Sequence, residues 1–285
     1  MKSIASFIVL TTLCLNCYAQ EPDNHPTEIK TAPWYVEKFR VSAGFFVPVT
    51  NTDLTVGIKG GTPGTPINFQ KDLGYSTTQL TFLADFQWRI SRKSRLSFSY
   101  YNIPRSSTHK LDKDITFKDS TYHVNSTVST FFNTAIYQIN YGYAIISKPD
   151  FEVGVMIGTH LVGGKTGISA VGSGGELTRS TDFGFTAPLP DLGVWGGYTF
   201  SDRFAVNLDI DYLSLTINNI TGSIFAYDLL FMYRIYDKLD IGVGYQGLNF
   251  KVDATKNGFE GDFKWGYNGP GLTVSYSFGK ASWKH

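Results

Sequence analysis

The sequence has little charge and no long apolar run beyond its N-terminal end. Charged residues make up 17% of the chain, against roughly 25% in an average soluble domain. The 25 Lys and Arg residues nearly balance the 24 Asp and Glu residues, so the net charge of +1 gives no electrostatic case for binding nucleic acid. After residue 19, no apolar stretch approaches the roughly 20 residues that a membrane-spanning helix needs.

Cysteine is absent from the predicted mature chain. Residues 1–19, MKSIASFIVLTTLCLNCYA, have the pattern of a secretory signal peptide, with Lys2 at the start, a short apolar stretch, and small residues before a cleavage point after Ala19. Cys14 and Cys17 both lie in this removed segment, and neither follows the small residue expected before a lipidated cysteine. An exported chain without disulfides needs another source of stability, and a closed, fully hydrogen-bonded sheet in lipid is one.

Aromatic residues and strict alternation are what the sequence does have. Aromatics reach 15%, and the stretch FAVNLDIDY at residues 204–212 alternates apolar and polar positions without a break, which indicates a strand. In a soluble sandwich the apolar row would point into the core. In an outer-membrane barrel it would face lipid, and the carboxylates would face the lumen. We predict the second orientation.

Ten segments are predicted to be strands, and the connections between them alternate in length. The segments are Phe39–Val49, Leu80–Ile90, Arg95–Ile103, Phe132–Ile146, Phe151–His160, Pro190–Phe200, Phe204–Tyr212, Ile224–Tyr236, Leu239–Phe250 and Gly269–Phe278. Turns of two to five residues follow the second, fourth, sixth and eighth, whereas residues 50–79, 105–130 and 163–190 are expected to be long loops and 251–264 an intermediate one. Short turns on one rim and long loops on the other are typical of outer-membrane barrels.

The predicted fold is therefore all-β: an antiparallel, up-and-down transmembrane β-barrel of about ten strands, with eight or twelve as alternatives. Twelve would result if TDLTVGI and TPINFQ crossed the membrane, but we expect these segments and ITFKDSTYHVN to extend hairpins above it. The expected organisation is a signal peptide at 1–19, a periplasmic lead-in at 20–36, the barrel at 37–279 and a short tail at 280–285. Both termini would be periplasmic and the long loops extracellular, in the outer membrane of a Gram-negative bacterium.

Several stretches resemble a family of uncharacterised proteobacterial outer-membrane β-barrel proteins. They are DLGYSTTQLTFLADFQWRISRKSRLSFSYYNIPRS, ITFKDSTYHVNSTVSTFFNTAIYQINYGYAI, APLPDLGVWGGYTFSDRFAVNLDIDYLSL and GFEGDFKWGYNGPGLTVSYSF. The resemblance covers nearly all of the mature chain and implies a fold and a location, but no reaction. Kinship to small barrels of the OmpA, OmpX and OmpW type is at the level of architecture.

Alternation assigns individual side chains to the two faces of the barrel. The residues expected to face lipid are Phe204, Val206, Leu208, Ile210, Tyr212, Leu272, Val274, Tyr276 and Phe278. The residues expected to form a polar network in the lumen are Asp85, Arg89, Arg95, Glu152, His160, Asp209, Asp211, Asp228, Arg234 and Asp240. Buried charges persist when they are paired, so a side-chain-filled lumen with a structural or surface-interaction role is the first interpretation.

Two other functions remain open from the sequence. A narrow path through the lumen would favour cations because of Asp209, Asp211 and Asp228. A lipid-modifying enzyme would need His160 beside a serine such as Ser99 or Ser214 and an acidic residue. No pair of histidines has metal-ligand spacing, and no cofactor is expected. The expected partners are outer-membrane lipids, lipopolysaccharide and the barrel-assembly machinery during insertion.

Overall fold

A computed structural model describes residues 32–57, 65–117, 120–171, 177–217, 220–256 and 259–280. The predicted signal peptide, most of the lead-in and residues 281–285 lie outside these ranges. Among the described residues, no helix is both long and apolar enough to span a bilayer.

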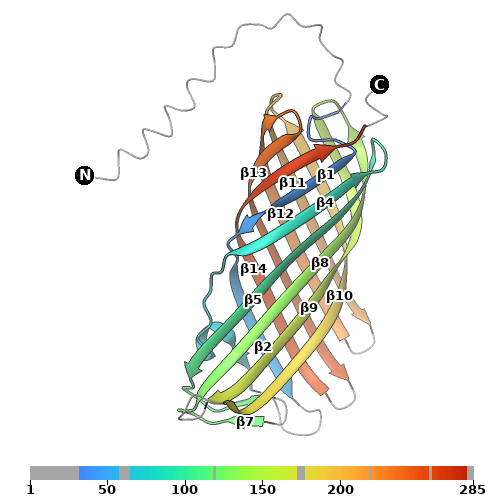
Figure 1. Ribbon diagram of the computed structural model, residues 1–285. Helices are drawn as coiled ribbons and strands as arrows, with labels where there is room; N and C mark the ends of the chain where they lie inside the picture. Colours follow the sequence, from blue (N-terminus) through green and yellow to red (C-terminus); the bar gives the residue numbers. More distant parts are fainter. Residues whose placement is uncertain are drawn as a thin grey trace, which may run out of the picture. The chain divides into compact units, whose positions relative to one another are not determined.

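Ten antiparallel strands form a closed ring (Figure 1). Each pairs with its neighbours in this order, and β14 pairs back onto β1, with Phe39 opposite Phe278. The ring is thus sealed by backbone hydrogen bonds, and the predicted barrel class is confirmed. The strands are β1 (Phe39–Phe46), β4 (Thr81–Arg89), β5 (Ser94–Lys110), β8 (Thr127–Ser147), β9 (Phe151–Val171), β10 (Leu177–Thr199), β11 (Phe204–Ile217), β12 (Ile220–Tyr236), β13 (Leu239–Lys256) and β14 (Phe259–Phe278).

Four further strands bring the total in the described part of the chain to fourteen, more than the ten predicted. β2 (Val49–Gly57) continues β1 beyond Val47 and Pro48 along the same edge of β14, and β3 (Ile67–Asn68) pairs with β2. β6 (Ile115–Phe117) and β7 (Ser120–Tyr122) form a separate hairpin, and α2 (Phe69–Asp72) is a single helical turn. These strands come from the segments expected to extend hairpins, and none of them is a member of the closed ring.

The expected long loops are largely strand, so that prediction is wrong. β8, β9 and β10 are 21, 21 and 23 residues long, about twice the roughly 9–11 residues needed to cross the hydrocarbon. β5 runs on to Lys110, and β13 and β14 continue through most of 251–264. On the side away from the short turns, the barrel wall therefore continues for about as many residues again as one bilayer crossing needs.

Polarity changes sides partway along these long strands, which explains why the extensions do not look like membrane strands. In the first half of β8, Phe132 is buried in the lumen and Asn133 is exposed outside. In the second half, Asn140 is buried in the lumen and Tyr141 is exposed outside. The outward row is apolar where lipid is expected and polar where water is expected, while the inward row does the opposite.

The lumen consequently has two zones, and the expectation of a polar interior throughout is wrong. Ionic and polar side chains fill the half near the short turns. The other half is a hydrophobic core whose members are buried as in a soluble barrel. These include Phe46, Ile103, Val128, Phe132, Ile136, Val162, Ile168, Leu248, Phe250 and Trp265.

Candidate functional site: the polar half of the lumen

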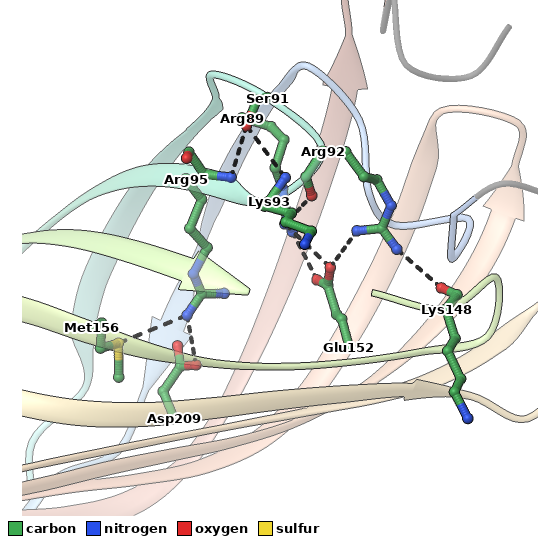
Figure 2. A network of polar contacts seen from close by, with 10 residues as sticks. Arg89, Ser91, Arg92, Lys93, Arg95, Lys148, Glu152, Met156 and Asp209 are labelled. Carbon is green, nitrogen blue, oxygen red and sulfur yellow. Dashed lines mark hydrogen bonds and ion pairs between the residues drawn. The ribbon is translucent and has the colours of Figure 1, made fainter. Parts of the chain in front are cut away.

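A buried ion cluster lies in the lumen near the short-turn rim (Figure 2). Arg89 of β4 donates to both carboxylate oxygens of Glu152 of β9, at 2.7 and 3.2 Å. Arg92, in the β4–β5 turn, donates to the same carboxylate at 2.8 Å and to the carbonyl of Lys148 at 2.9 Å. A carboxylate with this many charged donors is well satisfied in a low-dielectric interior.

Arg95 of β5 forms the next layer of the cluster. Its Nη2 donates to Asp209 of β11 at 2.9 Å and lies 3.8 Å from the sulfur of Met156. Its guanidinium lies 3.9 Å from the centre of the Trp195 ring, and that of Arg89 lies 5.5 Å from it. The buried indole therefore lies against two arginines at once, in the geometry of a cation–π contact.

The N-terminal segment fills the remaining mouth of the lumen. Ala32, Tyr35 and Val36 are buried in one cluster with Ala205 and Met232, so residues expected to be an irregular lead-in are part of the plug. The aromatic pair Trp34–Tyr35 directly before β1 was the available signal for this, since two large aromatics rarely stay in water without a role.

Two further arginines occupy this end of the lumen. Arg234 lies 5.4 Å from the Trp34 ring, rather than in an ion pair with the other predicted residues. Arg40 of β1 donates to Asp240 of β13 at 2.6 Å. Arg40 was missed from the sequence, although its position in β1 places it on the same inward face as Ser42.

Beyond the ion cluster lies a polar chamber of about 160 Å³. Four of the predicted carboxylates line it together, namely Asp85, Asp209, Asp211 and Asp228. Arg40, Arg95 and His160 are the basic groups in its wall. Gln138 donates to Asp211 at 3.4 Å, and Ser99 is hydrogen-bonded to Asp85. These side chains come from seven strands, β1, β4, β5, β8, β9, β11 and β12, and meet in one cavity.

His160 is held by a partner that the sequence interpretation did not name. Its Nδ1 lies 2.8 Å from Asp191 of the neighbouring strand β10, and both side chains are buried. A carboxylate at Nδ1 fixes the ring orientation and leaves Nε2 as the acceptor, an arrangement that could serve a general base. Ser99 lines the same chamber, whereas Ser214 is exposed and lies on the outward face of β11 with Tyr212. Among the described residues, no group of three or more His, Cys, Asp or Glu could hold a metal ion.

A third buried arginine, Arg105, lies at the other end, outside the strand segments that carry the exposed apolar row. Arg105 donates to Thr50 at 2.8 Å and to Thr52 at 2.6 Å, and lies between the rings of Tyr75 and Phe132. Burial raises the pKa of Tyr75 to about 12, so its hydroxyl is neutral near pH 7. These contacts join β5 to β2 beyond the end of β4, which pairs with β5 only as far as Tyr101.

Comparison with solved structures identifies the architecture. The outer-membrane protease OmpT of Escherichia coli superposes with a TM-score of 0.54 at 10% identity, covering 86% of this chain and 100% of that one. The fold is that of an outer-membrane β-barrel. Lower similarity is found to the toluene transporter TodX of Pseudomonas putida (TM-score 0.36, 10% identity, 88% and 93% covered) and to the translocator domain of the autotransporter NalP of Neisseria meningitidis (0.44, 11%, 96% and 96%).

The similarity is one of architecture alone. No protein-family model matches the sequence, and no curated protein matches it. Membership of the family that the sequence resembles is therefore not shown, and at 10% identity the protease supplies a fold and not a reaction.

Proposed function

We propose that this protein is an integral outer-membrane barrel whose lumen is closed by side chains and whose tall outer half is a surface-interaction structure. One observation carries the proposal: Glu152, Arg89 and Arg92 form a buried ion cluster across the lumen, with the 32–36 segment packed below it. A lumen filled in this way has a structural role and does not provide a wide aqueous path.

The outward apolar row supports the membrane placement. Large apolar side chains are exposed on the outer face of all ten ring strands, on the half with the short turns, where a soluble protein would bury them. Representative members are Val41, Phe82, Phe98, Tyr141, Val155, Val194, Leu208, Phe231, Val243 and Val274. We define these outward residues and their neighbours on the same face as the apolar belt.

The rim with the short turns is assigned to the periplasm. Phe39 and Phe278, near the two ends of the described chain, are paired there. The opposite half, with its polar outer face, would then stand in water outside the cell, where outer-membrane lipids and lipopolysaccharide are its expected neighbours. Recognition in such barrels is usually carried by the exposed end.

Planar-bilayer recording tests the closed lumen. The purified wild-type protein should give no steady unitary currents at neutral pH, because the ion cluster fills the lumen near the short-turn rim. Steady currents that Asp209→Asn and Asp211→Asn reduce or make less cation-selective would instead establish the narrow cation channel.

The buried His160–Asp191 pair favours a second candidate, an enzyme that acts on lipid. Its test is a comparison of membrane lipids from cells that express the wild type, His160→Ala and Asp191→Asn at equal folded levels. Loss of a new lipid product in both variants would support hydrolysis. Identical lipid profiles in wild type and variants would remove this candidate.

A further inference from the structure

The barrel wall opens between β10 and β11 above the apolar belt. Their ladder begins with Thr199 opposite Ala205 and ends with Leu192 opposite Tyr212. Both strands continue, but within the described chain residues 186–191 of β10 form no pair with 213–217 of β11. On its other edge, β10 stays paired with β9 throughout the same stretch. We call this opening the seam.

Two prolines face the seam. Thr199 N–H donates to Asp150 on the β9 side, and Phe200 N–H donates to Phe204 on the β11 side. Because successive residues of a strand point their backbone groups to opposite edges, and no bulge interrupts β10 here, the nitrogens of Pro188 and Pro190 both face β11. Proline has no N–H to donate, so β10 offers β11 no backbone donor at these two positions and the ladder ends before them.

Behind the seam lies an apolar cavity of about 460 Å³, within the range of sites that bind small molecules. Phe185 and Leu189 line it from β10, and Leu213 and Leu215 line it from β11. Leu215 lies on the inward face of its strand and is nevertheless 42% exposed, which shows that the cavity is open at this side.

The seam begins where the apolar belt ends. Leu192 and Tyr212, the last pair of the ladder, project outward with exposures of 55% and 58%. Pro188 and Pro190 continue the outward row of Leu192 as exposed apolar residues. The β10 side of the path from the outer surface into the cavity is therefore apolar, and the cavity is lined mainly by apolar side chains, which favours a hydrocarbon chain over a polar solute.

The wall has a second gap, between β2 and β5, and this one is covered. Between β2 and β5, the segment 65–80 fills the space left by the short β4. Three side chains of this segment, Phe69, Leu73 and Tyr75, are buried. Arg105 joins the two sides. The β10–β11 seam has no comparable covering segment among the described residues.

We propose that the seam is a lateral entrance through which one acyl chain of an outer-leaflet lipid enters the cavity. This inference rests on the proposed membrane placement. The dense hydrophobic core that contains Phe250 and Trp265 packs against the cavity-lining Phe263, so the chain would be held and not passed through the lumen.

Photocrosslinking in phosphatidylcholine vesicles tests the entrance. A benzophenone side chain is placed at Phe185 in the cavity, at Leu208 in the apolar belt, or at Phe250 in the closed core. Phospholipid adducts found by mass spectrometry are expected at Phe185 and Leu208, and at least tenfold fewer at Phe250. Adducts at Leu208 but none at Phe185 would overturn the entrance alone, while none at Leu208 would overturn the membrane placement.

A second experiment closes the seam. The double change Pro188→Val with Pro190→Val restores two backbone N–H donors on the edge of β10 that faces β11. Alternatively, a disulfide between cysteines at Pro190 and Ser214 can lock the seam, since 190 and 214 are the positions that would pair if the ladder continued. Either change should lower the Phe185 adduct several-fold and leave the Leu208 adduct unchanged. A cysteine pair at Val194 and Ile210, which already face each other, is the control. An unchanged Phe185 adduct in a locked seam would refute lateral entry.

Discussion

Arg89 of β4 and Glu152 of β9 face each other across the lumen, joined by two hydrogen bonds of 2.7 and 3.2 Å, with both side chains 1% exposed. The two residues are 63 positions apart in sequence. Their contact lies in the interior at the level where the short turns join the strands, and Arg92 adds a third donor from the adjacent turn.

Removing the shared carboxylate should destabilise the barrel strongly. Glu152→Gln leaves Arg89 and Arg92 buried without a counter-charge, and breaking a buried ion pair in this way costs about 3–5 kcal/mol. Urea unfolding in lipid vesicles measures the loss of unfolding free energy. Asp253→Asn is the control, since the Lys251–Asp253 pair is well exposed and should contribute little. Equal effects of the two changes would mean that the plug is not a major source of stability.

Two glycines of β9 should respond differently to an added methyl group. A Cβ at Gly154 would collide with the carbonyl oxygen of Tyr143 and lie 2.6 Å from Nε1 of Trp195, whereas at Gly163 its nearest neighbour is 3.8 Å away. Gly154→Ala should therefore lower the unfolding free energy by about 1–3 kcal/mol, as overpacking does. Gly163→Ala should be close to neutral. Denaturant midpoints of the two variants compare them, and a neutral Gly154→Ala would show that Trp195 is loosely packed.

The apolar belt can be probed with a single charge. Leu208→Arg places a cation on the outer face of β11 within the belt, at a cost of about 2–4 kcal/mol near the bilayer midplane. Ser180→Arg places the same cation on the outer face of β10 beyond the belt, where water is expected. The fraction folded in vesicles, read from heat-dependent gel mobility, should fall for Leu208→Arg alone. Equal tolerance of both changes would argue against lipid contact at Leu208.

The β6–β7 hairpin should be sensitive to acid. The backbone N–H of Val124, and secondarily the ring of His123, lower the pKa of Asp114. A depressed folded-state pKa means that the contribution is present above the ordinary value of about 3.9 and is lost as pH falls through the folded value. The Val124 amide shift in NMR should therefore stay constant down to about pH 4 and move below it. Asp114→Asn should abolish that transition, and a transition centred above pH 5 would contradict the assignment.

Much of the architecture follows from local pattern. Alternation in Phe204–Tyr212 assigns Leu208 outward and Asp209 inward whatever the rest of the chain does, because side chains of a strand alternate with a period of two. Repeated over ten segments, with a short turn after every second one, this alternation predicts a barrel. The strand prediction for β9 stopped too early, at residue 160. Beyond the apolar belt the outward row becomes polar, so the contrast that marks a membrane strand is reversed and the extension was not recognised.

What the sequence by itself determined is the all-β class and the face on which each residue of a predicted strand lies. Only the tertiary structure decided which inward residues meet, because neighbours across the lumen depend on strand register and closure, which no local pattern encodes. Arg40 meets Asp240, His160 meets Asp191, and Arg234 meets Trp34 for this reason. The seam also depends on tertiary structure. Pro188 and Pro190 are visible in the sequence, but the strand that their backbone nitrogens face is set by the pairing of β10 with both neighbours.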